Sequence, residues 1–342
     1  MKKLVLSILL LAAMLPSMAL GQGKKQMMFG VAFYNLENLF DTIPNNPYGR
    51  DVEFTPGGDN KWDSHKYWSK IKNMSYAISQ LVTDKTPDGP AVIGVSEIEN
   101  ITVLQDLVNA EPRKKWNLQI KHHDSPDRRG VDVGLLYNPK FFKPIHMTNH
   151  TLDIGYPTRD QMCVVGLLGG SRTAIIVNHW PSRRGGDASS WSREKAAELT
   201  RHICDSLYKV DPNMGIIILG DLNDDPSNKS CAEVLGAVKK EKDCKEGGFF
   251  NPFWKKLDEG IGSYIYRGGW DLFDQIIINY NLLTGKNGLT YRNAKVWNDL
   301  PFLIQQDGQY KGYPLRTFSS GKWSNGYSDH LPTEIFLVKD MN

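Results

Sequence analysis

Apolar residues along this chain occur either in short continuous runs or at helical spacing. The short runs are each followed by polar residues, which is typical of buried β-strands that end in loops. They cover residues 29–34, 91–95, 131–137, 174–177, 215–219, 272–278 and 333–338. Residues 64–82 and 194–208 instead repeat apolar positions every three or four residues and predict helices, the second with Ser192 as its N-cap. The pattern predicts an α/β chain.

No stretch that resembles a linker divides the predicted elements. The chain has no internal repeat, heptad pattern or low-complexity segment, and polar clusters at strand ends run from Asn35 to His330. We therefore expect one domain over residues 22–342. Many strands with helices between them predict an α/β sandwich, in which two sheets pack together and helices cover their outer faces.

The N-terminus has the three parts of a secretory signal, which are Lys2 with Lys3, an apolar run over residues 4–15, and small residues over 17–21. We expect residues 1–21 to be a signal peptide and the mature protein to be secreted or periplasmic. The apolar run is too short for a comfortable transmembrane helix, and no later stretch approaches the roughly 20 apolar residues that span a bilayer. We expect no stable membrane insertion, and we expect a monomer.

The charge balance limits the kinds of partner. The chain has 342 residues, 40% hydrophobic and 11% aromatic, which can supply a large core. Its 41 Lys and Arg residues fall to 39 without Lys2 and Lys3, against 38 Asp and Glu, so the mature chain is nearly neutral. Proteins that grip long nucleic acids usually carry a larger basic excess. The balance favours transient contact with a phosphate over tight nonspecific binding.

The four cysteines, Cys163, Cys204, Cys231 and Cys244, show no metal-type CxxC spacing. An oxidising compartment would permit disulfides, and Cys231 with Cys244 is the preferred pair. Buried free thiols are an equally good interpretation, because a chain with an adequate core does not need a disulfide.

Polar clusters directly follow three of the predicted strands. Asn35 and Glu37 follow the first, and taken alone they suit an ordinary strand-end turn. Glu97 places a carboxylate just past a buried strand, where ligands commonly bind. Asp221 and Asn223 present carboxylate and amide oxygens together. Such a loop suits a hard cation such as Mg²⁺ as well as it suits a solvated turn.

Two of the eight histidines, His179 and His330, lie at the termini of predicted strands, and His330 follows Asp329 directly. A lone histidine is more often structural. Two at strand termini form a candidate acid/base pair, because imidazole titrates near physiological pH and a neighbouring carboxylate can fix its tautomer.

The ordered series of motifs resembles the endonuclease/exonuclease/phosphatase superfamily, which has the DNase-I-like fold. The motifs are Y-N-L-E (34–37), V-S-E (95–97), R-G-V-D-V (129–133), T-R-D-Q-M (158–162), V-N-H-W (177–180), G-D-L-N-D (220–224), F-D-Q-I-I (273–277) and S-D-H-L-P (328–332). They span most of the mature chain, and the GDxN and SDH elements occur in the family's order. The resemblance implies a four-layered α/β sandwich, with two packed mixed β-sheets flanked by helices.

The resemblance also implies a divalent-metal site. Glu97 matches the family's principal metal-ligand carboxylate, and Asn35 and Asp329 complete or support that site. Glu37 stands where some members have a further acid, and it is included among the metal residues. Oxygen ligands of this kind imply Mg²⁺, with Mn²⁺ or Ca²⁺ as alternatives.

The catalytic residues implied by the resemblance are His179, Asp221, Asn223, Asp274 and His330. His330 matches the histidine that contacts the scissile phosphate and helps to activate water, and Asp274 matches the acid that orients it. Asp221 and Asn223 match the pair that positions nucleophile and phosphate. His179 matches a candidate leaving-group acid. These roles supply the positioned water, the base and the charge stabilisation that phosphodiester hydrolysis needs.

Three further residues are matched to substrate binding. Arg159 resembles the family's phosphate-contacting arginine, and Asp132 is matched to the acid beside the leaving-group histidine. Arg129 belongs to one of two arginine pairs that could line a groove for a polyphosphate backbone or could be ordinary solvated loop charge. The pairs are Arg128-Arg129 and Arg183-Arg184.

The expected partner is a phosphoester, and its kind stays open. One hypothesis is a secreted or periplasmic nuclease that cuts DNA or RNA, based on His179, the arginine pairs and the export signal. A second is a hydrolase of small-molecule or lipid-headgroup phosphoesters, based on the near-neutral charge and on aromatic residues that could stack on bases, cover a headgroup or simply pack a loop. These aromatics are Tyr310, Tyr313, Phe318, Trp323 and Tyr327. A silent binding module is disfavoured, because the catalytic set is complete.

Overall fold

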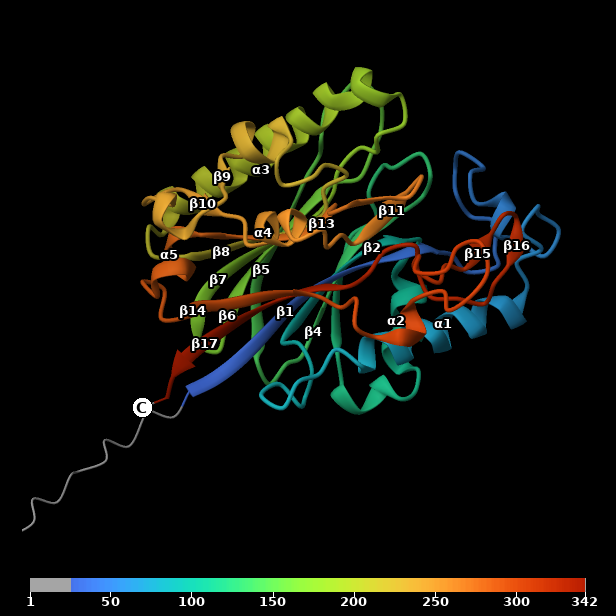
Figure 1. Cartoon of the computed structure of the whole chain (residues 1–342), viewed down its shortest axis with the longest axis horizontal. Helices are drawn as coiled ribbons and strands as arrows, with labels where there is room; N and C mark the ends of the chain where they lie inside the picture. The colour runs from blue at the N-terminus through green and yellow to red at the C-terminus, as the bar shows by residue number, and fades with distance from the viewer. Residues whose placement is uncertain (1–25, 342) are drawn as a thin grey trace, which may run out of the picture.

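Two β-sheets stack face to face in the computed structural model, which describes residues 26–341 (Figure 1). The strands of the first sheet are β1 (Gln26–Leu39), β2 (Val92–Ile98), β3 (Gln119–His122), β4 (Asp132–Tyr137), β14 (Thr290–Val296) and β17 (Thr333–Asp340). They lie in the order β14-β17-β1-β2-β4-β3, so the two ends of the described chain pair at the middle of this sheet. The predicted signal peptide, residues 1–21, lies outside the described residues.

The second sheet has seven strands. They are β5 (Phe142–His150), β6 (Gln161–Leu168), β7 (Ser171–His179), β8 (Gly215–Asp221), β9 (Ala237–Val238), β10 (Phe249–Phe250) and β13 (Asp274–Asn279). Their order is β5-β6-β7-β8-β13-β10-β9, and β7 and β8 are parallel while most neighbours are antiparallel. Two hairpins stand apart from the sheets, β11 (Tyr264–Tyr266) with β12 (Gly269–Asp271), and β15 (Phe318–Ser319) with β16 (Lys322–Trp323).

Helices cover the outer faces of both sheets (Figure 1). They are α1 (Ser64–Ser79), α2 (Ile101–Asn109), α3 (Ser190–Val210), α4 (Phe253–Asp258) and α5 (Tyr280–Thr284). Short helical turns lie at η1 (Val52–Phe54), η2 (Arg113–Trp116), η3 (Gly186–Ser189), η4 (Ser230–Val234), η5 (Glu241–Asp243) and η6 (Pro301–Leu303). Among residues 26–341, no helix has the length and apolar character needed to cross a bilayer.

Alternating side chains on β8 show how the layers form. Ile217 and Leu219 belong to the core cluster that also contains the strands of the first sheet, whereas Ile216 and Ile218 pack in a second cluster with α3. Both faces of this strand are buried, so its sequence is a continuous apolar run. With α1 and α2 on the first sheet and α3 on the second, the chain has four layers, which confirms the predicted sandwich.

All seven predicted strands are present, as β1, β2, β4, β7, β8, β13 and β17, and the two predicted helices are α1 and α3. The prediction for Ser192 is wrong. Helix α3 begins at Ser190 with Ser189 as its N-cap residue, and the Ser192 hydroxyl donates to the Ser189 carbonyl from inside the first turn.

The four cysteines are buried free thiols. The preferred Cys231–Cys244 disulfide is therefore wrong, and the alternative interpretation holds. The physical reason is their placement, because Cys231 packs in the cluster beneath α3 while Cys244 packs in the larger cluster between the sheets. Burial raises the pKa of Cys231 to about 12, so this thiol is unreactive.

Candidate active site

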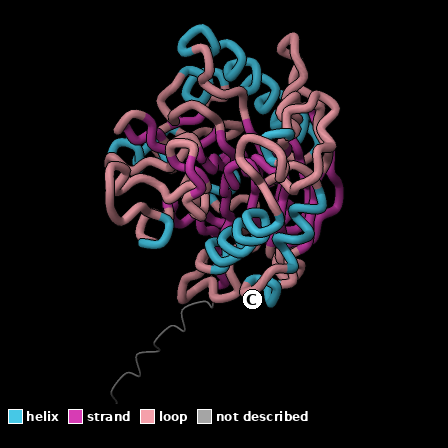
Figure 2. The backbone as a smooth tube through the Cα atoms, turned by 90° about the vertical axis from the view of Figure 1, so that its right-hand side faces the viewer, coloured by secondary structure: helices cyan, strands magenta, loops and turns pink. Residues whose placement is uncertain are grey.

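The ends of several strands meet toward the right-hand side of Figure 1, the side that faces the viewer in Figure 2, where loops surround the strands. Parallel pairing brings Asn35 on β1 beside the end of β2, which carries Glu97. In the other sheet, Asp221 at the end of β8 pairs with His179 on β7 and with Asp274 on β13. Residues far apart in sequence thus reach one place because sheet register aligns them.

Irregular backbone conformations set the direction of two side chains at these strand ends, those of Glu97 and Asn223. Glu97 has a φ of +58° and Asn223 a φ of +51°, a left-handed conformation that residues with a side chain rarely adopt. The pairing of β2 with β4 also shifts register between Ser96 and Ile98, on either side of Glu97. Bulges and strained residues of this kind gather at functional sites, where they redirect a side chain.

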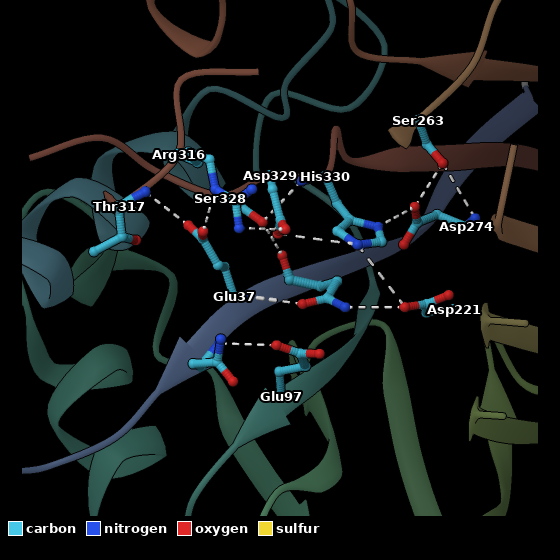
Figure 3. Close-up of polar contacts among 12 residues, drawn as sticks. Glu37, Glu97, Asp221, Ser263, Asp274, Arg316, Thr317, Ser328, Asp329 and His330 are labelled. Atoms are coloured by element: carbon cyan, nitrogen blue, oxygen red, sulfur yellow. Dashed lines mark hydrogen bonds and ion pairs between the residues drawn. The ribbon is translucent and has the colours of Figure 1, made fainter. Parts of the chain in front are cut away.

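His330 is oriented by a buried chain of hydrogen bonds from β13 (Figure 3). Its Nδ1 lies 2.7 Å from Oδ2 of Asp274, and the same oxygen accepts a hydrogen bond from the Ser263 hydroxyl at 2.5 Å. The Tyr264 ring packs against the imidazole with centroids 4.8 Å apart. Because Nδ1 is engaged, Nε2 is the nitrogen left for chemistry.

Ser328 fixes the loop that carries His330. Its hydroxyl donates to the Asn35 carbonyl at 2.7 Å and accepts from the His330 backbone N–H at 3.1 Å. This tie joins the loop to β1 and directs Nε2 of His330 inward. That nitrogen lies 3.9 Å from carboxylate oxygens of both Asp221 and Asp329.

Asp221 lies between the two histidines. Its Oδ2 is 3.6 Å from Nε2 of His179 and 3.9 Å from Nε2 of His330. The Asn35 side-chain amide donates to Oδ2 and the Asn223 backbone N–H donates to Oδ1, both at 3.0 Å. The carboxylate is thus held in place, with an imidazole on each side of one oxygen.

The two imidazoles have opposite pKa shifts. Burial, reinforced by the guanidinium of Arg159, lowers the pKa of His179 well below its usual value. Burial also disfavours charge on His330, but nearby carboxylates, above all Asp274, outweigh it and raise its pKa well above the usual value. These directions favour a neutral His179, which suits a base, and a charged His330, which suits an acid, the reverse of the roles that the resemblance implies. Neighbouring titratable groups whose pKa values are pushed apart are typical of an acid/base pair.

The carboxyl groups of the site also differ in the direction of their pKa shifts. Burial raises the pKa of Asp221 to about 7, against a smaller lowering by His330. Burial would raise the pKa of Glu97 too, but Arg129 and the two histidines reverse the shift and hold it well below the usual value. Glu97 is therefore ionised across the physiological range, as a metal ligand must be.

The oxygens of Glu97 and Asp329 fit a divalent cation. Among the described residues, Oε2 of Glu97 accepts a hydrogen bond only from the Asn38 N–H, at 3.0 Å, and its Oε1 lies 3.2 Å from Arg129. Oδ1 of Asp329 accepts no hydrogen bond from the described part of the chain, and its Oδ2 accepts one from Arg316. Charged carboxylate oxygens with open coordination are the donors that hard cations prefer.

A second candidate group consists of Asp221, Asp274 and His330, whose ligand atoms lie within 4.8 Å of one another. His330 and Ser263 both bond Oδ2 of Asp274, whose Oδ1 has no hydrogen-bond partner among the described residues, whereas each oxygen of Asp221 accepts one hydrogen bond. Asn35 lies between Glu37 and Asp221, because its Oδ1 accepts the Glu37 N–H and its Nδ2 donates to Asp221.

Figure 3 shows the Glu37 carboxylate directed at Arg316 and Thr317, which disagrees with its predicted role as a metal ligand. Its Oε1 accepts from Arg316 at 2.9 Å and its Oε2 from the Thr317 N–H at 2.7 Å. The Lys70 ammonium lies 3.8 Å from Oε2. With both oxygens occupied, Glu37 anchors the loop that carries Arg316.

Arg159 does not face a substrate, contrary to its predicted role. It is buried, and it donates to the backbone carbonyls of His179 at 3.3 Å and Trp180 at 2.8 Å. Its remaining nitrogen lies 3.2 Å from Asp127. This residue holds the end of β7, and so positions His179 from behind.

Asp132 contacts His122 and not His179, which disagrees with its predicted place beside that histidine. Its carboxylate bonds Nε2 of His122 at 3.1 Å and accepts from the Ser125 N–H at 2.9 Å. These contacts order the loop between β3 and β4.

Arg129, from the same loop, does reach the site, because it donates to Glu97 at 3.2 Å and to Asn38 at 2.7 Å.

The two members of the arginine pair Arg183-Arg184 differ in their contacts. Arg183 stacks over Phe273 at 4.5 Å and contacts Asp224 at 3.3 Å and Asp225 at 3.0 Å, so it is a structural residue. Arg184 is exposed and has no ion pair within residues 26–341. The aromatic residues before Asp329 mostly pack the loop, as Tyr327 does against Phe302.

Sequence reasoning missed Ser263, Lys70 and Arg316. No local signal marks Ser263, because it lies outside the strands and becomes a partner of Asp274 only through folding. Lys70 lies on the buried face of α1, where an apolar residue would be expected, and that break in periodicity was the available signal.

Comparison with curated protein sequences finds no match. Among solved structures, TDP2 of D. rerio with humanising mutations has a TM-score of 0.57 at 11% identity, covering 91% of this chain and 98% of that one. A D. rerio TDP2 complex with a single-strand DNA product has a TM-score of 0.55 at 11% identity, with the same coverage.

A mannosyl-6-phosphatase of Bacteroides thetaiotaomicron has a TM-score of 0.52 at 14% identity, covering 90% of this chain and 99% of that one. These likenesses show a common fold. The model of the Endonuclease/Exonuclease/phosphatase family matches residues 30–339, nearly the whole described chain. Together with the fold and the site, this match shows that the chain belongs to the endonuclease/exonuclease/phosphatase family of phosphoester hydrolases.

Proposed function

We propose that this protein is an exported, Mg²⁺-dependent phosphodiesterase that hydrolyses DNA or RNA. The observation that carries the proposal is the placement of His179 and His330, whose Nε2 atoms lie 3.6 and 3.9 Å from one oxygen of Asp221. Hydrolysis of a phosphodiester needs one group to take a proton from water and another to deliver one to the leaving oxygen. Two imidazoles with opposite pKa shifts around one carboxylate suit this exchange.

The chain's own residues orient each participant. Asp274 holds the Nδ1 proton of His330, so Nε2 faces the phosphate. Asp221, fixed by Asn35 and Asn223, is placed to bind the attacking water. A divalent cation at Glu97 and Asp329 would stabilise charge on the phosphate as a Lewis acid.

The DNA product bound to the D. rerio TDP2 structure supports a nucleic-acid substrate for this fold. A second candidate is hydrolysis of small phosphoesters. It is favoured by a cavity of about 530 Å³ beside the site, a size that suits a small ligand. The mannosyl-6-phosphatase among the similar structures supports the same candidate.

The proposal is tested by incubating the purified protein, residues 22–342, with plasmid DNA, RNA and a panel of sugar phosphates, nucleotides, inositol phosphates and sphingomyelin. Each substrate is tested with Mg²⁺, Mn²⁺ or Ca²⁺ and with EDTA. We expect metal-dependent cleavage of DNA or RNA. Hydrolysis of small phosphoesters alone would replace the first candidate with the second, and no hydrolysis of any substrate would contradict both.

We also propose export to the periplasm or the medium, which rests on the N-terminal charged, apolar and small-residue regions. Expression of the full chain followed by mass spectrometry of the secreted and periplasmic fractions tests this proposal. We expect a mature N-terminus near Gln22. A chain that keeps Met1 and stays in the cytoplasm would contradict export.

A further inference from the structure

A cavity of about 530 Å³ opens beside the candidate active site and is lined by five arginines. We call it the arginine pocket, and its arginines are Arg50, Arg128, Arg129, Arg184 and Arg316. The only carboxylates among its lining residues are Glu37 and Glu53. The described lining is therefore strongly positive, although the chain as a whole is nearly neutral.

Three of these arginines have no balancing acid. Arg50, Arg128 and Arg184 are exposed, and none makes an ion pair with another described residue. The Arg128 guanidinium lies over the Tyr156 ring, with its carbon 6.0 Å from the ring centroid. Guanidinium groups with free N–H donors match phosphate oxygens in charge and shape.

The other two arginines connect the pocket to the reacting centre. Arg129 donates to Oε1 of Glu97 at 3.2 Å, and Arg316 donates to Oδ2 of Asp329 at 2.9 Å. Glu97 and Asp329 are the carboxylates that fit the cation. Figure 3 shows Arg316 and Asp274 on opposite sides of the Asp329 and His330 pair, so the pocket flanks the site on the side away from Asp274.

Folding brings these arginines together from separate parts of the chain. Arg50 lies in the loop after β1, Arg128 in the loop before β4, Arg184 in the loop after β7, and Arg316 in the loop before β15. Solvated loop arginines repel one another and have no reason to converge. Four loops that direct positive charge into one cavity indicate a site for an anion.

The pocket also has an apolar wall, formed by Phe54 and Phe318. Phe54 is fixed by stacking on Phe40, with ring centroids 4.4 Å apart. Such a wall can contact the ring of a sugar, polyol or base that carries a phosphate. The cavity therefore suits a phosphorylated group and is larger than a bare phosphate requires.

We infer that the arginine pocket binds a second phosphate of the substrate while the scissile phosphate lies at His330, so that the preferred substrates carry at least two phosphates. This inference rests on the proposed hydrolase function and specifies its substrate class. The second phosphate has two possible sources, the neighbouring phosphate of an oligonucleotide or another phosphate on a sugar or polyol.

Two pairs of substrates test the inference and separate the sources. One pair is a dinucleotide with and without a 5′-phosphate, and the other is a sugar phosphodiester with and without a second phosphate. We expect kcat/KM to favour the doubly phosphorylated member of at least one pair by about ten- to a hundredfold, the range for lost charge-assisted hydrogen bonds. The pair that shows this preference identifies the source.

The variant Arg50→Ala/Arg128→Ala/Arg184→Ala should lower that preference toward one, mainly through KM. Arg292→Ala, an exposed arginine on β14 outside the pocket, is the matched control and should keep the wild-type preference. Calorimetry with inorganic pyrophosphate adds a readout independent of turnover. Pyrophosphate should bind the wild-type protein and bind the triple variant at least about tenfold more weakly.

The outcomes distinguish this inference from the proposed function. Equal turnover of both members in each pair, or a triple variant with the wild-type preference, would overturn the second-phosphate site while leaving phosphoester hydrolysis intact. Absence of hydrolysis for these four substrates and for the whole panel above would contradict the proposed function. Unchanged pyrophosphate binding in the triple variant would overturn the pocket independently of turnover.

Discussion

Glu334 is a buried acid whose replacement should change how stability depends on pH. It lies on β17 with no exposed surface, and its Oε2 accepts a hydrogen bond from the Trp297 indole at 2.9 Å. Its Oε1 has no hydrogen-bond partner among the described residues. Burial raises the pKa of this carboxyl from 4.5 to about 8, so it is protonated in the folded protein at neutral pH.

The sign and size of the effect follow from this shift. Below pH 4.5 the carboxyl is protonated in both the folded and the unfolded chain, and its stabilising contribution is fully present. Between pH 4.5 and about 8 the unfolded chain releases the proton while the folded protein keeps it, so stability falls as pH rises. Each pH unit costs about 1.4 kcal/mol, which gives roughly 5 kcal/mol over the whole window.

The perturbation is Glu334→Gln, which keeps the shape of the neutral acid and removes the titration. We expect urea unfolding to show a higher free energy of unfolding for the variant than for the wild type at pH 8, and little difference at pH 5. Glu198→Gln on the exposed face of α3, where Glu198 pairs with Lys195, is the control and should follow the wild-type profile. If wild type and Glu334→Gln lose stability in parallel from pH 5 to pH 8, the reasoning is refuted.

Three further predictions concern the site and its supports. Asp274→Asn should lower kcat by about a hundred- to ten-thousandfold with a smaller change in KM, because His330 loses the acceptor that fixes its tautomer. Steady-state kinetics measure this effect, and an unchanged kcat would contradict the prediction. Gly220→Ala should lower stability by about 1–3 kcal/mol in thermal unfolding, because a Cβ there would lie 2.2 Å from the Asn178 carbonyl oxygen; an unchanged Tm would contradict this close packing. Lys70→Met should lower the free energy of unfolding by about 3 kcal/mol, because it leaves Glu37 with one fewer cation. The double variant Lys70→Met/Glu37→Gln should recover part of this loss, and additive losses would contradict the coupling.

The strands that the sequence predicted share one property, which is burial on both faces. Residues 216–219 of β8 are continuously apolar for that reason. Strand β5 was missed because it lies at the edge of its sheet and carries Lys143, Pro144 and His146 among its apolar residues. Strand β14 is also an edge strand with exposed polar positions. Local pattern is weaker at edges, where solvent replaces a neighbour, but the buried strand β6 between β5 and β7 was missed as well.

The sequence identified most residues of the candidate site, but it did not predict the direction in which each side chain points. Glu37 lies near the end of β1 and Glu97 near the end of β2, and both have positive φ, so no local feature distinguishes them. Their partners do, because Arg316, 279 residues away, occupies an oxygen of Glu37. Arg159 was assigned to substrate for a similar reason, since its contacts with the His179 and Trp180 carbonyls exist only in the folded chain.

The central claim is that His330 acts at a phosphoester within a metal-dependent site, and one comparison of rates tests it most directly. Hydrolysis of the best substrate is measured with Mg²⁺ and with EDTA for the wild type, His330→Ala and His202→Ala, an exposed histidine on α3. We predict that EDTA abolishes activity, that His330→Ala lowers kcat by about a hundredfold or more with an unchanged fold by circular dichroism, and that His202→Ala behaves as the wild type. Full activity of His330→Ala, or full activity in EDTA, would contradict the account.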